Sequence, residues 1–345
     1  MKKKKEPDKK ENNKKKWRAK VVLLSAFLAG GVCGFLIDRY IPMGDQEQSS
    51  IPEIRPGGYE FINPLLECET AQDTVEGKNL RSLKRKIHDF IDEKEKERGI
   101  SHVSVYYRDL NNGPWIGVDE KVLFSPSSLL KVPLMMAVLK DAETNPQILR
   151  QRFTFTDKDS NTFENIKSSK AIELGKSYSA EELIHFMIAN SDNNAYLLLL
   201  KNFSQDKLIR VYTELGVAVP YDSKKEDFMS VKEYASFFRI LFNASYLNRE
   251  MSMKALKFLS VADYRNGIVA GVPSNVGVVH KFGERSLGAD AEIKQMHDCG
   301  IVYYPDHPYL LCIMTRGKTF SRLEGIIKDV SQLVYNELDN LYREK

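Results

Sequence analysis

The chain has 345 residues, of which 42% are hydrophobic and 10% aromatic, so it can bury a core in one large domain or two modest ones. Its net charge of +4 arises from residues 1–20, which carry 11 Lys and Arg against 3 Asp and Glu, whereas residues 21–345 carry 40 against 44. Because the basic residues form a terminal tail and not a cluster on a folded face, the composition argues against a nucleic-acid-binding domain.

Residues 21–37 form an uncharged, largely apolar run directly after the basic tail. A helix of this length spans roughly 25 Å, the short end of a transmembrane segment. Since Lys and Arg gather before the run and Trp17 and Tyr40 flank it, we expect an uncleaved anchor with residues 1–20 in the cytoplasm. Two alternatives remain. A cleaved signal peptide would place its small residues after the run, and a lipid-modified Cys33 would follow a leucine and a small residue.

Residues 38–78 are predicted to be an extracytoplasmic tether, because the polar stretch 42–58 contains Pro and Gly and shows no periodicity. The folded domain is therefore expected over 79–345, on the outer side of the cell membrane.

Strands are predicted at both ends of this domain, with helices between them. Apolar periodicity, Ser or Asn caps and terminal glycines predict helices over 80–99, 127–143, 179–190, 194–203, 204–216, 230–245 and 251–260, and after Ser321. Alternation and turn residues predict strands over 102–110, 113–120, 276–284, 293–305 and 309–317. This order predicts an α+β fold, in which N- and C-terminal helices cover an antiparallel sheet and an all-α lobe is inserted over about 128–270. A cleft between sheet and lobe is the expected place for a site.

Ser128 and Lys131 form an S-x-x-K pattern at the start of a predicted helix, where positions three apart share a face. A serine needs a nearby base to act as a nucleophile, and a lysine amine serves as one where an apolar environment or another cation lowers its pKa. Alone the pattern is weak. Ser204 and Lys207 repeat it in a stretch better suited to a solvated cap, whereas Ser125 and Ser127 have no lysine three positions later.

Two further motifs follow along the chain. Ser191-Asp192-Asn193 lies between two predicted helices, where it would also serve as a helix break and cap. Lys281-Phe282-Gly283 lies on a predicted strand. A lysine on an apolar strand followed by glycine suggests a close backbone approach to a ligand, although an edge-strand lysine is an equal alternative.

In this order the three motifs resemble the S-x-x-K, S-D-N and K-T-G pattern of the serine β-lactamase and penicillin-binding superfamily, most closely the class A β-lactamase-related serine hydrolases. The resemblance covers about 80–345. It implies that Ser128 is the acylated nucleophile, that Lys131 is its activating base, and that Ser191 is a proton relay. Asn193 would hold Lys131 and the substrate.

The same resemblance implies a substrate-binding wall on the predicted strand that carries Lys281. Lys281 would bridge to the relay serine across the cleft and attract a substrate carboxylate. The oxyanion hole would use the backbone N–H of the nucleophile and that of Glu284, the residue after Gly283. Arg285 would either add positive potential or lie in solvent.

The chain departs from the family pattern at two places. Phe282 replaces the family threonine, whose hydroxyl binds a substrate carboxylate, and its ring is expected either in the cleft or in the core. The glutamate motif of the family's Ω loop, which activates the deacylating water, is absent. Only Glu226 and Asp227 are nearby carboxylates, and turn residues are the simpler interpretation of both. Acylation of the nucleophile is therefore expected, and turnover of the acyl-enzyme is expected to be slow.

The leading hypothesis is a membrane-anchored serine hydrolase that cleaves the amide of β-lactam-type substrates. The alternatives are a penicillin-binding D,D-carboxypeptidase or other hydrolase of peptidoglycan peptides, and a non-catalytic binder on the same fold. We expect no cofactor, no metal and no nucleic-acid partner. At most one disulfide is expected among Cys68, Cys299 and Cys312, and its pairing is open.

Overall fold

The computed structural model describes residues 58–64, 80–111, 113–156, 165, 166, 168–220, 226–288 and 290–343. All of them belong to one unit of the chain, residues 53–345. Among these described residues no helix is long and apolar enough to cross a membrane. The predicted anchor at 21–37 lies outside them.

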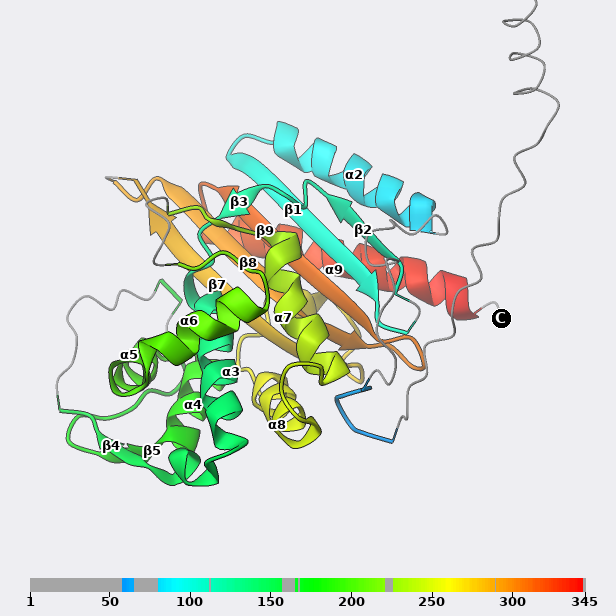
Figure 1. The fold of residues 1–345 in the computed structure, drawn as a ribbon. Coiled ribbons are helices and arrows are strands. Elements are labelled where there is room, and N and C mark those ends of the chain that lie inside the picture. The colour runs from blue at the N-terminus through cyan, green and yellow to red at the C-terminus, as the bar shows by residue number, and fades with distance from the viewer. Residues whose placement is uncertain are drawn as a thin grey trace, which may run out of the picture. The chain divides into compact units, whose positions relative to one another are not determined.

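A five-stranded antiparallel sheet organises the domain, with strand order β2-β1-β9-β8-β7. The first two strands in the chain occupy one side of the sheet and the last three complete it, as expected for a sheet built from both ends of the chain (Figure 1). Their bounds are β1 Ile100–Asp109, β2 Trp115–Val118, β7 Gly277–Leu287, β8 Ile293–Tyr303 and β9 Tyr309–Gly317. Because β7 pairs only with β8, its other edge is free to face the helical lobe.

Helices cover both faces of this sheet (Figure 1). One face contacts α2 Arg81–Lys96 and α9 Phe320–Arg343, whose apolar positions recur at helical spacing. The other face contacts α7 Val231–Asn243. The remaining helices form the inserted lobe, namely α3 Lys131–Ala142, α4 Ala180–Ala189, α5 Asn193–Asn202, α6 Gln205–Glu214 and α8 Arg249–Ser260.

Local sequence explains where several helices of the domain begin. Ser179 and Ser230 each form a capping box with the glutamate three residues later, at the starts of α4 and α7. Asn248 caps α8 through its side chain. Short elements connect the helices: the strand pairs β3 Leu123–Phe124 with β6 Met229–Ser230, and β4 Arg152–Thr154 with β5 Ser177–Ser179, and the 3-10 turns η3 Ser127–Leu130, η4 Pro146–Arg150 and η5 Ile268–Gly271. Of these, η3 is the start of the helix predicted over 127–143, and the others were not predicted.

Alternate residues of the central strands enter two different hydrophobic clusters. On β9, Leu310, Cys312 and Met314 pack toward the lobe, whereas Leu311 and Ile313 pack toward α2 and α9. Since both faces are buried, β9 is almost continuously apolar and does not alternate with polar residues.

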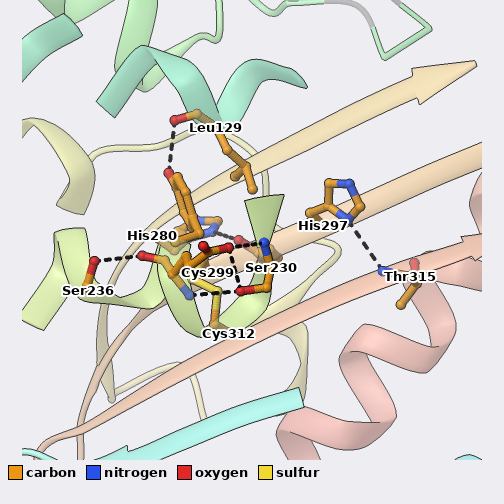
Figure 2. The surroundings of a disulfide bond; sticks show 11 residues. Leu129, Ser230, Ser236, His280, His297, Cys299, Cys312 and Thr315 are labelled. Carbon is orange, nitrogen blue, oxygen red and sulfur yellow. Dashed lines mark hydrogen bonds and ion pairs between the residues drawn. A yellow bond between two sulfur atoms is a disulfide. The ribbon is translucent and has the colours of Figure 1, made fainter. Parts of the chain in front are cut away.

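The disulfide joins Cys299 of β8 to Cys312 of β9, which stand directly opposite each other in the strand register (Figure 2). The pairing left open by the sequence is therefore within the hairpin, and Cys68 takes no part in it. Opposite positions on neighbouring antiparallel strands bring Cβ atoms close together, which is the geometry a disulfide requires.

Part of the predicted tether packs on the domain. Ile62 is buried, the backbone N–H of Asn63 donates to the carbonyl of Phe242 on α7, and the hydroxyl of Tyr303 donates to the carbonyl of Phe61. Residues 61–63 therefore belong to the folded unit, and the tether prediction for this short stretch is wrong.

Candidate active site

Ser128 lies in η3, directly before α3, where the turn brings it onto the lysine that begins the helix. The Nζ atom of Lys131 is 3.0 Å from the Oγ atom of Ser128. Tyr234 of α7 holds the turn, because its hydroxyl donates to the carbonyl of Leu129. Lys131 itself is only 2% exposed, because the apolar run that follows packs α3 into the core.

Four oxygen atoms surround the amine of Lys131. Besides Ser128 Oγ, they are the carbonyl and Oγ (3.1 Å) of Ser191 and the Oδ1 atom of Asn193 (2.7 Å). The carbonyl and amide oxygens only accept hydrogen bonds. A neutral amine that donates its two N–H groups to them directs its lone pair to the Ser128 hydroxyl. This is the arrangement that a base for Ser128 requires.

The S-D-N motif forms the turn between α4 and α5. Ser191 has a φ of 57°, a left-handed conformation that is uncommon for a residue with a side chain. Asp192 is fully buried and caps α5 by accepting from the N–H of Asn194, and it also accepts from the N–H of Ile172. The middle residue therefore fixes the turn, so that its two neighbours reach Lys131.

Lys281 of β7 completes the cluster from the opposite wall. Its Nζ atom is 2.9 Å from Ser191 Oγ, so this hydroxyl lies within hydrogen-bond distance of both lysines. Burial, and then the positive charge of Lys131, lowers the pKa of Lys281 well below its ordinary value, while Asp298 opposes the shift. The described structure thus brings Ser128, Lys131, Ser191, Asn193 and Lys281 into one group.

Gly283 allows strand β7 to approach closely the turn that carries Ser128. A Cβ atom at Gly283 would lie 2.8 Å from the carbonyl oxygen of Pro126 and 3.0 Å from Leu129 Cγ. The glycine therefore allows close contact between β7 and η3, and its role in substrate binding stays a prediction. Any side chain here would push the turn carrying Ser128 away from the strand.

Glu284 presents its backbone to the free edge of β7. Its carbonyl accepts a hydrogen bond from Ser127 Oγ at 2.6 Å, across the edge that β8 does not occupy. In an antiparallel strand the N–H and C=O of one residue point to the same side. The N–H of Glu284 therefore also points toward η3, where the family resemblance places an oxyanion donor.

Phe282 turns its ring into the core, one of the two orientations that the sequence allowed. The ring stacks on Tyr264 at a centroid distance of 4.1 Å and is 6% exposed. Lys281 Nζ lies 4.3 Å from the ring centroid, a cation–π distance. Phe282 thus supports the lysine and offers no hydroxyl to a substrate.

Glu226 and Asp227, the two carboxylates considered for a deacylating role, are both engaged with basic side chains. Glu226 forms an exposed ion pair with Arg285 at 3.0 Å. Asp227 pairs with Arg316 at 2.7 Å and accepts from Gln295 at 2.8 Å. Arg285 therefore lies at the surface, paired with Glu226, which is the solvent position that the sequence analysis gave as its second alternative.

Sequence reasoning missed a clamp on the strand segment that leads to the nucleophile. Gln295 Oε1 accepts from the N–H of Ser125, and His297 Nε2 donates to the Ser125 carbonyl. Both side chains come from alternate positions of β8, and all three residues are buried. Gln295 and His297, polar residues at alternate positions of β8, were the available signal.

His297 acts in this clamp as a neutral imidazole. Burial lowers its pKa to about 4. The N–H of Thr315 donates to its Nδ1 atom, which leaves the proton on Nε2 for the Ser125 carbonyl (Figure 2).

Within the described ranges, one His and carboxylate group has ligand atoms close enough for a metal ion: Glu95, His102 and Asp119. The imidazole lies between the carboxylates, with Nδ1 3.6 Å from Glu95 and Nε2 3.6 Å from Asp119. One metal binds one ring nitrogen, and here the two carboxylates lie at opposite ring nitrogens, so this arrangement does not favour one ion shared by all three residues. The group is also separate from the serine and lysine cluster.

The model of the Beta-lactamase enzyme family matches residues 82–338. The chain belongs to the Beta-lactamase enzyme family. It is a serine hydrolase of the kind that works through an acyl-enzyme, related to the serine β-lactamases.

Solved structures support the same fold. PBP-A is 20% identical with a TM-score of 0.62, over 76% of this chain and 97% of PBP-A. A class A β-lactamase from Bacteroides cellulosilyticus is 19% identical with a TM-score of 0.63, over 74% of this chain and 98% of the enzyme. A PBP-A variant was solved as an acyl-enzyme complex with penicillin G, with a TM-score of 0.61 and 20% identity over 76% of this chain and 97% of the variant. No curated protein sequence matches the chain.

Proposed function

We propose that Ser128 is the nucleophile of this family member and that it is acylated by the amide of β-lactam-type substrates. In its neutral form, Lys131 takes the Ser128 proton as Oγ attacks the carbonyl carbon. The N–H groups of Ser128 and Glu284 stabilise the oxyanion, and the C–N bond then breaks while Ser191 passes a proton to the leaving nitrogen. The 3.0 Å contact of Lys131 Nζ with Ser128 Oγ, beside oxygens of Ser191 and Asn193 that accept from the same amine, carries this proposal.

The proposal is tested by incubating the protein with penicillin G and measuring intact mass. We expect a Ser128 adduct that Ser128→Ala abolishes, and Lys131→Met should slow acylation by about 10²–10⁴-fold, the usual contribution of a general base. Ser204→Ala and Lys207→Met are matched controls, because they alter the second S-x-x-K, where Lys207 pairs with Asp141 on the surface. An adduct that survives in Ser128→Ala would refute the assignment.

A second candidate is a penicillin-binding peptide hydrolase of the D,D-carboxypeptidase type, which would keep a β-lactam acyl group. The ion pairs of Glu226 and Asp227 with arginines favour it, because neither carboxylate is left to activate a deacylating water. Following β-lactam absorbance beside intact mass separates the two candidates. A persistent adduct supports the penicillin-binding enzyme, and steady loss of absorbance supports a β-lactamase.

We further propose that residues 21–37 anchor the protein in the cell membrane, with the hydrolase domain on the outer side. The basic tail and the uncharged run support this proposal. The full chain should sediment with membranes, and protease added to intact spheroplasts should remove the domain. Protection of the domain in intact spheroplasts would contradict it.

A further inference from the structure

A segment between β4 and β5 is attached to β7 beside the nucleophile. The N–H of Asn165 (2.7 Å), its side-chain amide and the N–H of Ile166 (3.3 Å) all donate to the carboxylate of Glu284. Ser286 donates to Asn165 Oδ1 at 3.1 Å. Glu284 and Ser286, two residues apart on β7, are therefore both hydrogen-bonded to Asn165.

The same segment is held at two further carboxylates. Ser169 donates to Asp263, which lies three residues after the end of α8, and the N–H of Ile172 donates to Asp192 at 2.7 Å. Asp192 is fully buried, whereas Asn165 is exposed, so the Glu284 attachment is the end open to water. We call residues 165, 166 and 168–172 the strap.

The strap connects the two walls that carry the candidate catalytic groups. Its buried end is bound to the middle residue of S-D-N, and its exposed end to the residue whose N–H is the proposed oxyanion donor. Moreover, the carbonyl of Glu284 is already occupied by the Ser127 hydroxyl. A free strand edge otherwise offers its N–H and C=O groups to an extended ligand.

We propose that the strap is a specificity determinant, which limits the substrate to compact groups on the acyl side of the scissile amide. This rests on the proposed acylation of Ser128. An acyl substituent that continues along β7 beyond the oxyanion position meets Asn165 and must displace three hydrogen bonds to Glu284. A small substituent ends before it. Asn165 is thus a positioning residue for the strap and takes no part in the bond changes.

The isosteric change Asn165→Asp tests this, because it replaces the amide donor with a carboxylate that repels Glu284. Acylation rates are measured with 6-aminopenicillanic acid, which has a bare amino group, and with a penicillin carrying a bulky aromatic side chain. The ratio of the bulky to the compact rate should rise about tenfold, the effect expected when hydrogen bonds worth about 1.4 kcal/mol are lost. Asn202→Asp, on the surface of α5, is the matched control and should leave the ratio unchanged.

Hydrogen exchange provides a readout independent of any substrate. The amides of Asn165 and Ile166 should exchange faster in Asn165→Asp, while that of Ile172, held by buried Asp192, should change less. Unchanged exchange, or faster exchange with an unchanged rate ratio, overturns the strap proposal.

Failure of the acylation proposal is distinguishable from failure of the strap. If neither penicillin reacts, the same comparison is made with a compact and a bulky alkyl fluorophosphonate, which modify a nucleophilic serine without β-lactam recognition. A higher bulky-to-compact ratio in Asn165→Asp then still supports the strap, and an equal ratio overturns it. No reaction with either reagent class overturns both proposals.

Discussion

At the scale of single residues, Phe282 decides how far the chain differs from its family. Its ring is buried against Tyr264 and faces Lys281 Nζ, so the position is part of the core. Phe282→Thr, which restores the family residue, should therefore lower stability by about 2–4 kcal/mol through lost packing and a buried hydroxyl. It should not speed acylation by penicillin G. Urea unfolding and intact-mass kinetics measure the two effects.

Phe282→Leu is the control for volume, and we expect it to cost less than about 1.5 kcal/mol, since it keeps an apolar side chain in the same space. Faster acylation in Phe282→Thr would show that position 282 faces the substrate, contrary to the buried orientation.

At the scale of elements, the β8–β9 hairpin supports the strand that carries Lys281. Cys299 stands opposite Lys281 on one side and is bonded to Cys312 on the other, and both sulfurs are fully buried. A bond closing a loop of 13 residues contributes about 3 kcal/mol in the chain-entropy description. Replacing both cysteines with alanine should lower the free energy of unfolding by about 2–4 kcal/mol in urea titrations.

Because the bond is buried, a reductant should act on it only when the protein unfolds. Dithiothreitol should therefore destabilise the unsubstituted protein to nearly the level of the double variant and leave the double variant unaffected. A wild-type stability that does not respond to reductant would mean that the bond contributes nothing.

At the scale of the whole molecule, His297 makes stability depend on pH. Its pKa falls from an unfolded value near 6.5 to about 4 in the folded state, so the unfolded chain binds more protons between these values. Stability from this group is complete above about pH 6.5 and is lost as the pH falls toward 4, by about 3 kcal/mol in total. Urea unfolding at pH 4 to 7 should show this decline.

His297→Gln keeps a neutral donor for the Ser125 carbonyl and cannot gain a charge. Its stability should therefore fall less steeply over the same interval, although carboxylate titration contributes equally to both proteins. Parallel curves for the two proteins would contradict the assignment.

The order of elements and the fold class were predictable from local patterns. Strand β9 was predicted at its observed bounds, and the helix starts at Ser179 and Ser230 follow from their capping residues. Ser128 and the four polar residues around it were also found from three motifs. These signals are local or depend only on the order of motifs, so they can be recognised without knowledge of the packing.

The sequence by itself therefore determined the antiparallel α+β domain, its inserted lobe and the serine, lysine and S-D-N constellation. Only the tertiary structure decided that Phe282 faces the core, that Glu226 and Asp227 bind arginines, that Cys299 pairs with Cys312, and that Asn165 is bound to Glu284. The physical reason is that a strand pattern of period two leaves the choice of face open until both faces have neighbours. Contacts between residues far apart along the chain exist only once the sheet and the lobe have packed together.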